Sequence, residues 1–254
     1  MQHSLSESVE MIAAAGYDGV EGAVEELADR SRFRTMLTDA RLAFIPLIYT
    51  EGHDPAEHLK NFSRLVAMAA EFVPTKIVAH AGRDLWSLDE QLRFLEAALR
   101  VEEAIGIPIA HETHRRRPLY SPMNARAILE RLPELKLNAD LSHWCCVTES
   151  MLDDHSDTIA FAATRTIHIH CRVGYENGPQ VSDPRATEWG GHLAKFESWW
   201  AQMIREQGDE KITVTPEFGP PSYMHTVPGT NQPVADLWEV CLWAARRFRT
   251  MARL

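Results

Sequence analysis

Short apolar runs alternate with longer amphipathic segments along most of the chain. Runs such as KIVAHAG, IPIAHE, LKLNAD and TIHIHC are short, apolar and partly β-branched, which is typical of buried strands. The longer segments between them place apolar residues at helical spacing. Strands that alternate with helices predict parallel βαβ units, and therefore an α/β fold.

The pattern can be written as seven strands and eight helices. The predicted strands cover residues 16–21, 41–49, 76–82, 107–112, 135–140, 166–171 and 212–217. The predicted helices cover residues 4–15, 24–40, 55–72, 87–105, 122–132, 147–162, 192–207 and 233–251. Several helix boundaries carry start and stop signals, namely Ser4 or Ser6, Asp54 with Pro55, Gly106, and Ser121 with Pro122.

Seven strands are one fewer than a (β/α)8 TIM barrel requires. The missing first strand would precede the helix at residues 4–15, so it is expected to be truncated, unless the barrel closes in another way. A doubly wound open sheet is the competing architecture, but it usually carries a glycine-rich phosphate loop. The glycines of GYDGVEG flank a strand and do not open a helix. Because no repeat or linker divides the chain, we expect a single domain over residues 1–254.

Polar residues of metal-binding type stand at the ends of four of these strands. They are Glu112, Asp140, His170 and Glu217. In a parallel barrel the carboxyl ends of the strands converge on one face, where the active site lies. Carboxylate oxygens and an imidazole nitrogen can together hold a divalent cation. Three buried carboxylates would repel one another without an ion, so the pattern predicts a metal site.

The overall charge changes which partners are expected. The formal net charge of −10 argues against a nucleic-acid partner, because phosphate binding needs a clustered basic surface. The one candidate for such a patch is HRRR at residues 114–117, which fits equally a solvated loop whose arginines pair with nearby carboxylates. No apolar run reaches the roughly 18 residues of a membrane span, and no signal peptide is visible. We therefore expect a cytoplasmic protein without membrane contact.

The four cysteines give no metal or disulfide pattern. Cys145, Cys146, Cys171 and Cys241 form no CxxC pair and match neither a zinc knuckle nor a disulfide framework. Free thiols in a reducing compartment are expected. A vicinal disulfide between Cys145 and Cys146 is the rarer alternative.

Taken in order, several strand-end segments resemble the xylose isomerase-like TIM-barrel superfamily, which includes sugar phosphate isomerases and epimerases and is distantly related to endonuclease IV. The matching segments are AGYDGVE, VAHAG, HETH, NADLSHW, HIHCR and TPEFGPPSY. The resemblance implies that the strands counted here are the second to the eighth of the barrel. It also implies that Glu112, Asp140, His170 and Glu217 bind one divalent ion (Mn²⁺, Mg²⁺, Co²⁺ or Zn²⁺), with His170 preferred to His168.

The resemblance further implies an activity. A metal-dependent isomerase or epimerase of a sugar or keto-polyol would work through an enediolate, with Glu112 and Glu217 moving the protons. In the alternative, the two glutamates are ligands only. A lyase or dehydratase of the keto-inositol or dehydroshikimate type, or a hydrolase, would use the same scaffold. An endonuclease and a non-catalytic fragment are weaker alternatives, and the strand at 41–49 lacks the histidine expected of a nuclease.

Four further residues are predicted to bind the carbohydrate substrate. They are His143, Arg172, His80 and Trp144. Trp144 would stack on a sugar face, as would Tyr223 after the last strand. Arg172 would bind a hydroxyl or phosphate group, or pair with Glu176. The long insertion over residues 172–190 is expected to fold over the pocket, or onto a second copy in a homo-oligomer.

Overall fold

The computed structural model describes residues 3–208 and 211–252. These residues divide into two compact units, one up to His111 and one from Glu112 onward, and each is described by itself. The first unit contains α1 (Leu5–Ala14), β1 (Gly19–Ala23), α2 (Arg30–Ala40), β2 (Ala43–Tyr49), α3 (Pro55–Ala70), β3 (Ile77–His80), α4 (Leu88–Ile105) and the first three residues of β4 (Ile109–Glu112).

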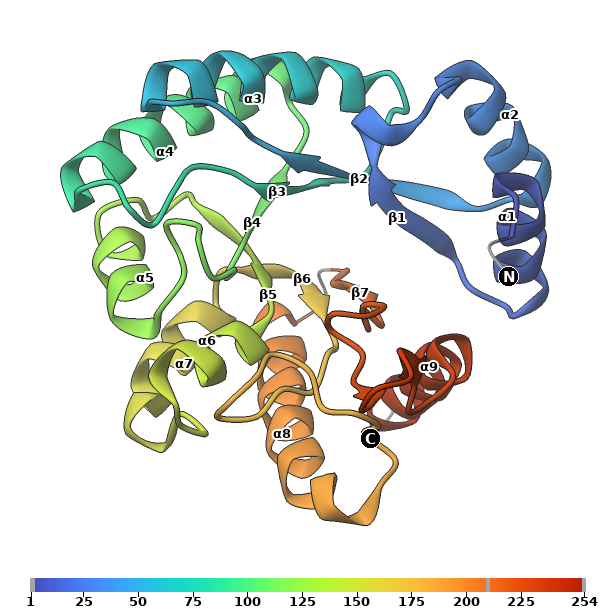
Figure 1. Cartoon of the computed structure of the whole chain (residues 1–254). Coiled ribbons are helices and arrows are strands. Elements are labelled where there is room, and N and C mark those ends of the chain that lie inside the picture. The colour runs from blue at the N-terminus through green and yellow to red at the C-terminus, as the bar shows by residue number, and fades with distance from the viewer. Residues whose placement is uncertain (1–2, 209–210, 253–254) are drawn as a thin grey trace. The chain divides into compact units, whose positions relative to one another are not determined.

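The strands of the first unit are parallel and follow the chain order β1-β2-β3-β4. Val20 pairs with Phe44, Val78 with Leu47, and Ile109 with Ile77. Helix α3 packs on β2 and on α4 (Figure 1). Every residue of β3 is buried, as expected for a parallel strand covered on both faces.

The helix-capping signals of the first unit act as the sequence predicts. Ser4 caps α1 in a reciprocal capping box with Glu7, and the Asp54 side chain accepts hydrogen bonds from two backbone N–H groups at the start of α3. Gly106 ends α4 with a φ of 69°, a left-handed conformation that costs glycine little. These local interactions explain why the predicted helix boundaries lie close to those observed.

The second unit begins with Glu112 and continues the alternation. It contains α5 (Pro122–Leu129), β5 (Lys136–Ala139), α6 (Leu141–Thr148), α7 (Ser156–Ala163), β6 (Thr166–His170), α8 (Gly190–Gln207), β7 (Thr213–Thr215), the strands β8 (Thr226–Val227) and β9 (Gln232–Pro233), and α9 (Leu237–Met251). Strands β5, β6 and β7 are parallel neighbours. Helix α7 packs on α8 and on β5.

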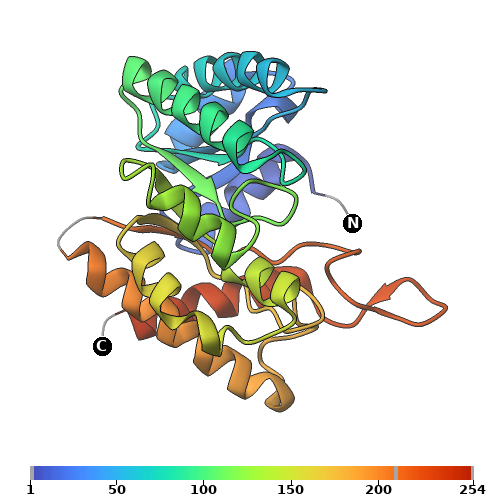
Figure 2. The same ribbon diagram turned by 90° about the vertical axis from the view of Figure 1, so that its left-hand side faces the viewer.

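Two sequence predictions need correction in these units. The range 147–162, predicted as one helix, contains only the end of α6, a break and most of α7. Helix α6 starts earlier, where the Asp140 side chain caps it, and ends with Glu149 as its C-cap, whose φ of 48° is left-handed. The helix predicted over residues 24–40 is a 3-10 turn (Val24–Glu26) followed by α2, which Asp29 caps. The sequence prediction also missed the antiparallel hairpin of β8 and β9, the orange-red segment that extends away from α8 in Figure 2.

Three global expectations can be compared with the described residues. Seven parallel strands are present among these residues, and the helix α1 precedes the first of the strands. All four cysteines are free thiols. No helix within the described ranges has both the length and the apolar character needed to cross a bilayer.

Candidate metal and catalytic site

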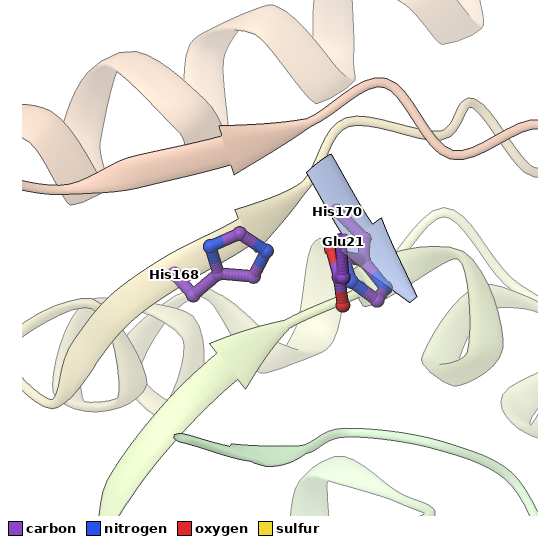
Figure 3. Close-up of side chains that lie close together, drawn as sticks. All are labelled: Glu21, His168 and His170. Carbon is purple, nitrogen blue, oxygen red and sulfur yellow. The ribbon is translucent and has the colours of Figure 1, made fainter. Parts of the chain in front are cut away.

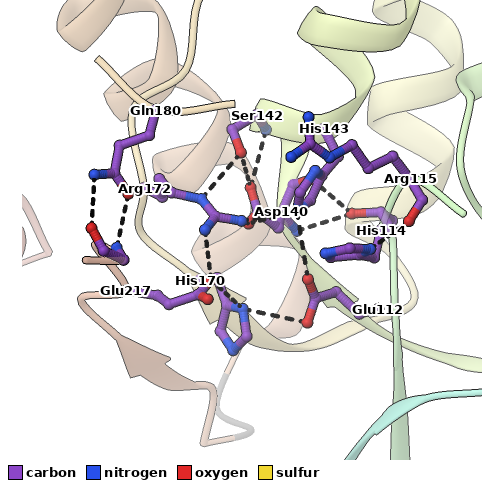
Figure 4. A network of polar contacts seen from close by, with 12 residues as sticks. Glu112, His114, Arg115, Asp140, Ser142, His143, His170, Arg172, Gln180 and Glu217 are labelled. Carbon is purple, nitrogen blue, oxygen red and sulfur yellow. Dashed lines mark hydrogen bonds and ion pairs between the residues drawn. The ribbon is translucent and has the colours of Figure 1, made fainter. Parts of the chain in front are cut away.

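Four side chains from four strand ends of the second unit converge. Glu112 is the last residue of β4, Asp140 directly follows β5, His170 ends β6, and Glu217 lies two residues beyond β7. Each of the four offers one ligand atom, and these atoms lie within 4.8 Å of one another. Figure 4 shows the four side chains pointing toward one another. The sequence prediction therefore identified a set of residues that the fold brings together.

His170 lies between the two glutamates. Its Nδ1 is 3.3 Å from Glu112 Oε2 and 3.0 Å from Glu217 Oε2. The side chains of His170 and Glu112 are buried, whereas that of Glu217 is 37% exposed. Glu217 is therefore the carboxylate of this set that a substrate reaches most easily.

His168 projects from the same strand as His170 (Figure 3) but has different neighbours. Its Nδ1 is 2.6 Å from Thr213 Oγ1, and its Nε2 is 3.2 Å from Thr215 Oγ1. Both threonines belong to β7, so the ring links two adjacent strands. These contacts are typical of a structural histidine, and the choice of His170 as the ligand stays a prediction.

Asp140 is held in place by hydrogen bonds on both its side chain and its backbone. Oδ1 accepts hydrogen bonds from Ser142 N, at 3.0 Å, and from the Ser142 hydroxyl. Thr113 Oγ1 accepts from Asp140 N at 2.8 Å and donates to Asp140 O at 2.9 Å. Because Asp140 also caps α6, a single residue both starts a helix and supplies one of the four candidate metal ligands.

Arg172 is the cation of the cluster, and its side chain is buried. Nη2 donates to Asp140 Oδ2, and Nη1 lies 3.3 Å from Glu217 Oε2. Nη2 also lies 2.8 Å from His143 Nε2. The alternative pairing with Glu176 is wrong, because Glu176 contacts His192 Nε2 at 3.2 Å. The charged partners of Arg172 are thus Asp140 and Glu217 of the carboxylate cluster.

The electrostatics of the three charged partners follow from burial and proximity. Burial raises the pKa of Asp140 to about 6, and the positive charge of Arg172 opposes part of that rise. Burial also acts to raise the pKa of Glu217, but the charges of Arg172 and His170 outweigh it and leave that pKa below its ordinary value. The neighbouring carboxylates overcome the effect of burial on Arg172 and raise its pKa, so the guanidinium stays charged.

The donor set fits one divalent cation. Three carboxylates and one guanidinium leave two net negative charges when all are ionised, and oxygen with imidazole donors suits Mg²⁺, Mn²⁺ or Zn²⁺. Arg172 contacts oxygens of two of these donors, Asp140 and Glu217. A bound cation would therefore share these oxygens with Arg172 or displace it from them.

Two residues that the sequence analysis missed support the site. Asn138 Nδ2 donates to Glu112 Oε2 at 3.0 Å and lies 3.0 Å from His170 Nε2, and the residue is fully buried. Strand alternation could have found it, since it lies two residues before Asp140 on the same face. Gln180 Oε1 accepts from Gly219 N at 2.7 Å, and its Nε2 donates to Gly219 O at 3.1 Å. This amide fastens the insertion to the segment that follows Glu217.

The four predicted substrate-binding residues lie in different environments in the structure. Arg172 lies in the cluster, as does His143, whose Nε2 is 3.6 Å from Asp140 Oδ2. Trp144 does not fit its expected role, because its side chain is fully buried and its indole N–H donates to Leu119 O at 2.8 Å. His80 belongs to the first unit, where its ring lies 4.6 Å from that of Tyr49, and its substrate role stays a prediction.

Comparison with known proteins identifies the fold. The sequence profile of xylose isomerase-like TIM barrels matches residues 9–232. No match was found among curated protein sequences.

Similar solved structures have different chemistries. Escherichia coli 3-keto-D-glucoside 4-epimerase YcjR is 15% identical, covers 98% of this chain and 95% of its own, and has a TM-score of 0.65. The probable 3-DHS dehydratase AsbF of Bacillus anthracis is 16% identical, with coverage of 88% and 90% and a TM-score of 0.59. A Mycobacterium smegmatis xylose isomerase-like TIM-barrel protein in complex with magnesium is 13% identical, with coverage of 97% and 87% and a TM-score of 0.66. At these identities the likeness establishes the fold alone.

Proposed function

Because the chain belongs to the xylose isomerase-like TIM-barrel family, we propose that it is a divalent-metal-dependent isomerase or epimerase of a sugar or keto-polyol. The observation that carries the proposal is the convergence of Glu112, Asp140, His170 and Glu217 within 4.8 Å. Magnesium in the similar Mycobacterium smegmatis structure supports a metal-binding role. When bound, a divalent cation would supply Lewis-acid stabilisation of the negative charge that develops on the substrate oxygens.

The residues of the chain would move the proton. Glu217 is partly exposed, and the charges of Arg172 and His170 hold its pKa below the ordinary value, so at neutral pH it is ionised and able to accept a proton from the carbon next to a carbonyl. Glu112 lies across His170 from Glu217. In this position Glu112, entering the step protonated, donates its own proton to the neighbouring carbon in an isomerisation, or to the opposite face of the same carbon in an epimerisation. Glu217 then holds the proton that it removed, and exchange with solvent resets both carboxyl groups.

Arg172 and His143 would orient the substrate. The Arg172 guanidinium and the His143 ring lie beside the carboxylates, where they can bind hydroxyl or carbonyl oxygens. Exclusion of water would come from the insertion, which Gln180 fastens to Gly219. These roles need no residue outside the second unit.

A dehydratase is the second candidate. Removal of the same proton begins β-elimination when a hydroxyl group stands on the next carbon, and one similar structure is a probable 3-DHS dehydratase. The two reactions differ in product, since elimination releases water and isomerisation does not.

The decisive experiment is a screen of aldo and keto sugars in D₂O with Mn²⁺-replete protein. Mass spectrometry or NMR would follow deuterium uptake at the carbon next to the carbonyl, together with the product formed. Uptake with isomer formation supports the isomerase or epimerase, and uptake with loss of water supports the dehydratase. If no substrate exchanges and calorimetry shows no binding of Mn²⁺, the proposal is overturned.

A further inference from the structure

A cavity of about 220 Å³ lies beside the carboxylate cluster in the second unit. Its lining includes Arg115, Tyr175, Asn177, Ser222, Tyr223 and His225. A single water needs about 10–15 Å³ of such space, so this cavity has room for a small molecule. Tyr223 connects it to the cluster, because the ring centroid of Tyr223 lies 5.0 Å from the Arg172 guanidinium carbon.

The lining is polar and positively charged. No carboxylate contributes to it within the part of the chain that the structure describes. Arg115 and His225 supply cationic or hydrogen-bonding nitrogens, while Tyr175, Tyr223 and Ser222 supply hydroxyl groups. A cavity with these groups attracts an anion, because its lining contains cationic and hydrogen-bonding groups and no carboxylate that would repel negative charge.

Arg115 is the informative member of this set. Its guanidinium lies 5.5 Å from the Tyr223 ring centroid and donates at 3.9 Å to Cys146 Sγ. No ion pair joins it to a carboxylate anywhere in residues 3–208 or 211–252. In a protein with a net charge of −10, a partly buried arginine without a carboxylate is available for an anion from outside.

Two guanidinium groups in different electrostatic environments therefore lie near the Tyr223 ring. Arg172 is neutralised by Asp140 and Glu217, whereas Arg115 faces the cavity without such a partner. Hydrogen bonds also join the two segments around the cavity. Gln180 lines the cavity and makes two hydrogen bonds to the backbone of Gly219, which lies between Glu217 and Tyr223 in the sequence. The cavity lining is therefore linked to the segment that carries Glu217.

We propose that this cavity is an oxyanion subsite, in which Arg115 binds the phosphate or carboxylate group of an acidic substrate. The identification of the ligand as a substrate rests on the proposed function, but the anion site itself does not. A substrate bound in this way would place its charged end against Arg115 and His225 and its hydroxy-carbonyl end against Glu112 and Glu217. The enzyme would then prefer sugar phosphates or sugar acids to neutral sugars.

The test is calorimetric titration of the full chain with inorganic phosphate and, separately, with acetate. Arg115→Gln should weaken binding by roughly ten- to hundredfold, as expected for the loss of a charged hydrogen-bonding partner. Arg116→Gln is the matched control, because Arg116 is an exposed neighbour outside the lining, and it should bind as the unaltered chain does. His225→Gln changes an exposed side chain and should weaken binding roughly two- to tenfold, which keeps the test valid if Arg115→Gln fails to fold.

The outcomes separate the two anion classes and the two proposals. Arg115-dependent binding of phosphate alone indicates phosphorylated substrates, and of acetate alone indicates sugar acids. Arg115-dependent binding of both indicates a general oxyanion site. If neither anion binds at millimolar concentration, or if the Arg115 and Arg116 variants weaken binding equally, the subsite is overturned. Because these titrations involve no turnover, they can succeed when the deuterium-exchange screen fails, and the reverse also holds.

Discussion

Arg172 and Asp140 form an ion pair in which the side chains are only 1% and 0% exposed. The same guanidinium lies 3.3 Å from Glu217 Oε2, so one buried cation contacts two of the four candidate metal ligands. A guanidinium and a divalent cation would compete for these oxygens. Arg172 is therefore expected to stabilise the metal-free protein and to oppose metal binding.

Arg172→Met tests this relationship. Breaking a buried pair leaves an uncompensated charge, so the free energy of unfolding of the metal-free protein should fall by about 3–5 kcal/mol. Mn²⁺ affinity should rise by about tenfold or more, equivalent to at least about 1.4 kcal/mol, because two ligand oxygens lose their competitor. Urea unfolding and calorimetry measure the two effects.

Arg185→Met is the matched control for that variant. Arg185 forms a two-pronged ion pair with Asp183 at the surface, where such a pair contributes about 1 kcal/mol or less. Its loss should leave Mn²⁺ affinity unchanged. Weaker Mn²⁺ binding by Arg172→Met would show that the guanidinium supports the metal and does not compete with it.

The two glutamates should differ from Asp140 in how they respond to excess metal. Glu112→Gln and Glu217→Gln should each abolish deuterium exchange at every Mn²⁺ concentration, because an amide can neither remove a proton from the carbon nor donate one to it. Asp140→Asn should act mainly through metal affinity, so excess Mn²⁺ should restore part of the exchange. Equal rescue of all three variants would mean that the glutamates are ligands alone.

Asn138→Leu should disturb two candidate ligands at once. The amide donates to Glu112 Oε2 and lies against His170 Nε2, both at 3.0 Å. Loss of such a partner behind metal ligands typically weakens metal binding by about 10- to 100-fold. Calorimetric titration with Mn²⁺ would measure this effect, and a variant with unchanged affinity would exclude a positioning role for Asn138.

Gly174 allows a close approach of the insertion to helix α6. A Cβ atom there would lie 2.7 Å from Ser142 Cβ and 3.1 Å from Pro179 O. Gly174→Ala should therefore lower the free energy of unfolding by about 1–3 kcal/mol, a typical cost of overpacking. Gly191→Ala is the control, since nothing lies within 4 Å of its added Cβ, and in helix α8 it should be neutral or stabilising by up to about 1 kcal/mol. Thermal or urea unfolding distinguishes the two.

His111 should make stability depend on pH. It is buried in the first unit and stacks on Phe62, and burial lowers its pKa from 6.5 to about 4. Below pH 6.5 the unfolded chain takes up a proton that the folded chain does not, so stability is lost as the pH falls from 6.5 toward 4. The slope is at most about 1.4 kcal/mol per pH unit.

Two variants isolate this contribution. In His111→Gln the difference in unfolding free energy between pH 6.5 and pH 4.5 should shrink, because no imidazole remains to be protonated in the unfolded state. His53→Gln, which changes an exposed histidine of the same unit, should leave that difference as it is. An unchanged pH dependence in His111→Gln would contradict the assignment.

The sequence by itself determined the order of the seven parallel strands, most of the helices between them and the identity of the converging residues. Apolar periodicity and the caps at Ser4, Asp54 and Ser121 act over a few residues, so they can be read along the chain. Glu112, Asp140, His170 and Glu217 could be selected because each follows or ends a strand, and parallel strands direct their carboxyl ends to one side. Helix α6 escaped prediction because the side chain of Asp140 was interpreted only as a ligand, although it also caps that helix.

Only the tertiary structure decided how the site is electrically balanced and what lies beside it. Arg172 meets Asp140 across 32 positions of sequence, Asn138 meets Glu112 across 26, and Gln180 meets Gly219 across 39. These contacts form only when the folded backbone brings distant residues together, so they cannot be predicted from local periodicity. The same holds for burial, which separates Trp144 in the core from Tyr223 at the cavity, although both aromatic residues follow strand ends in the sequence.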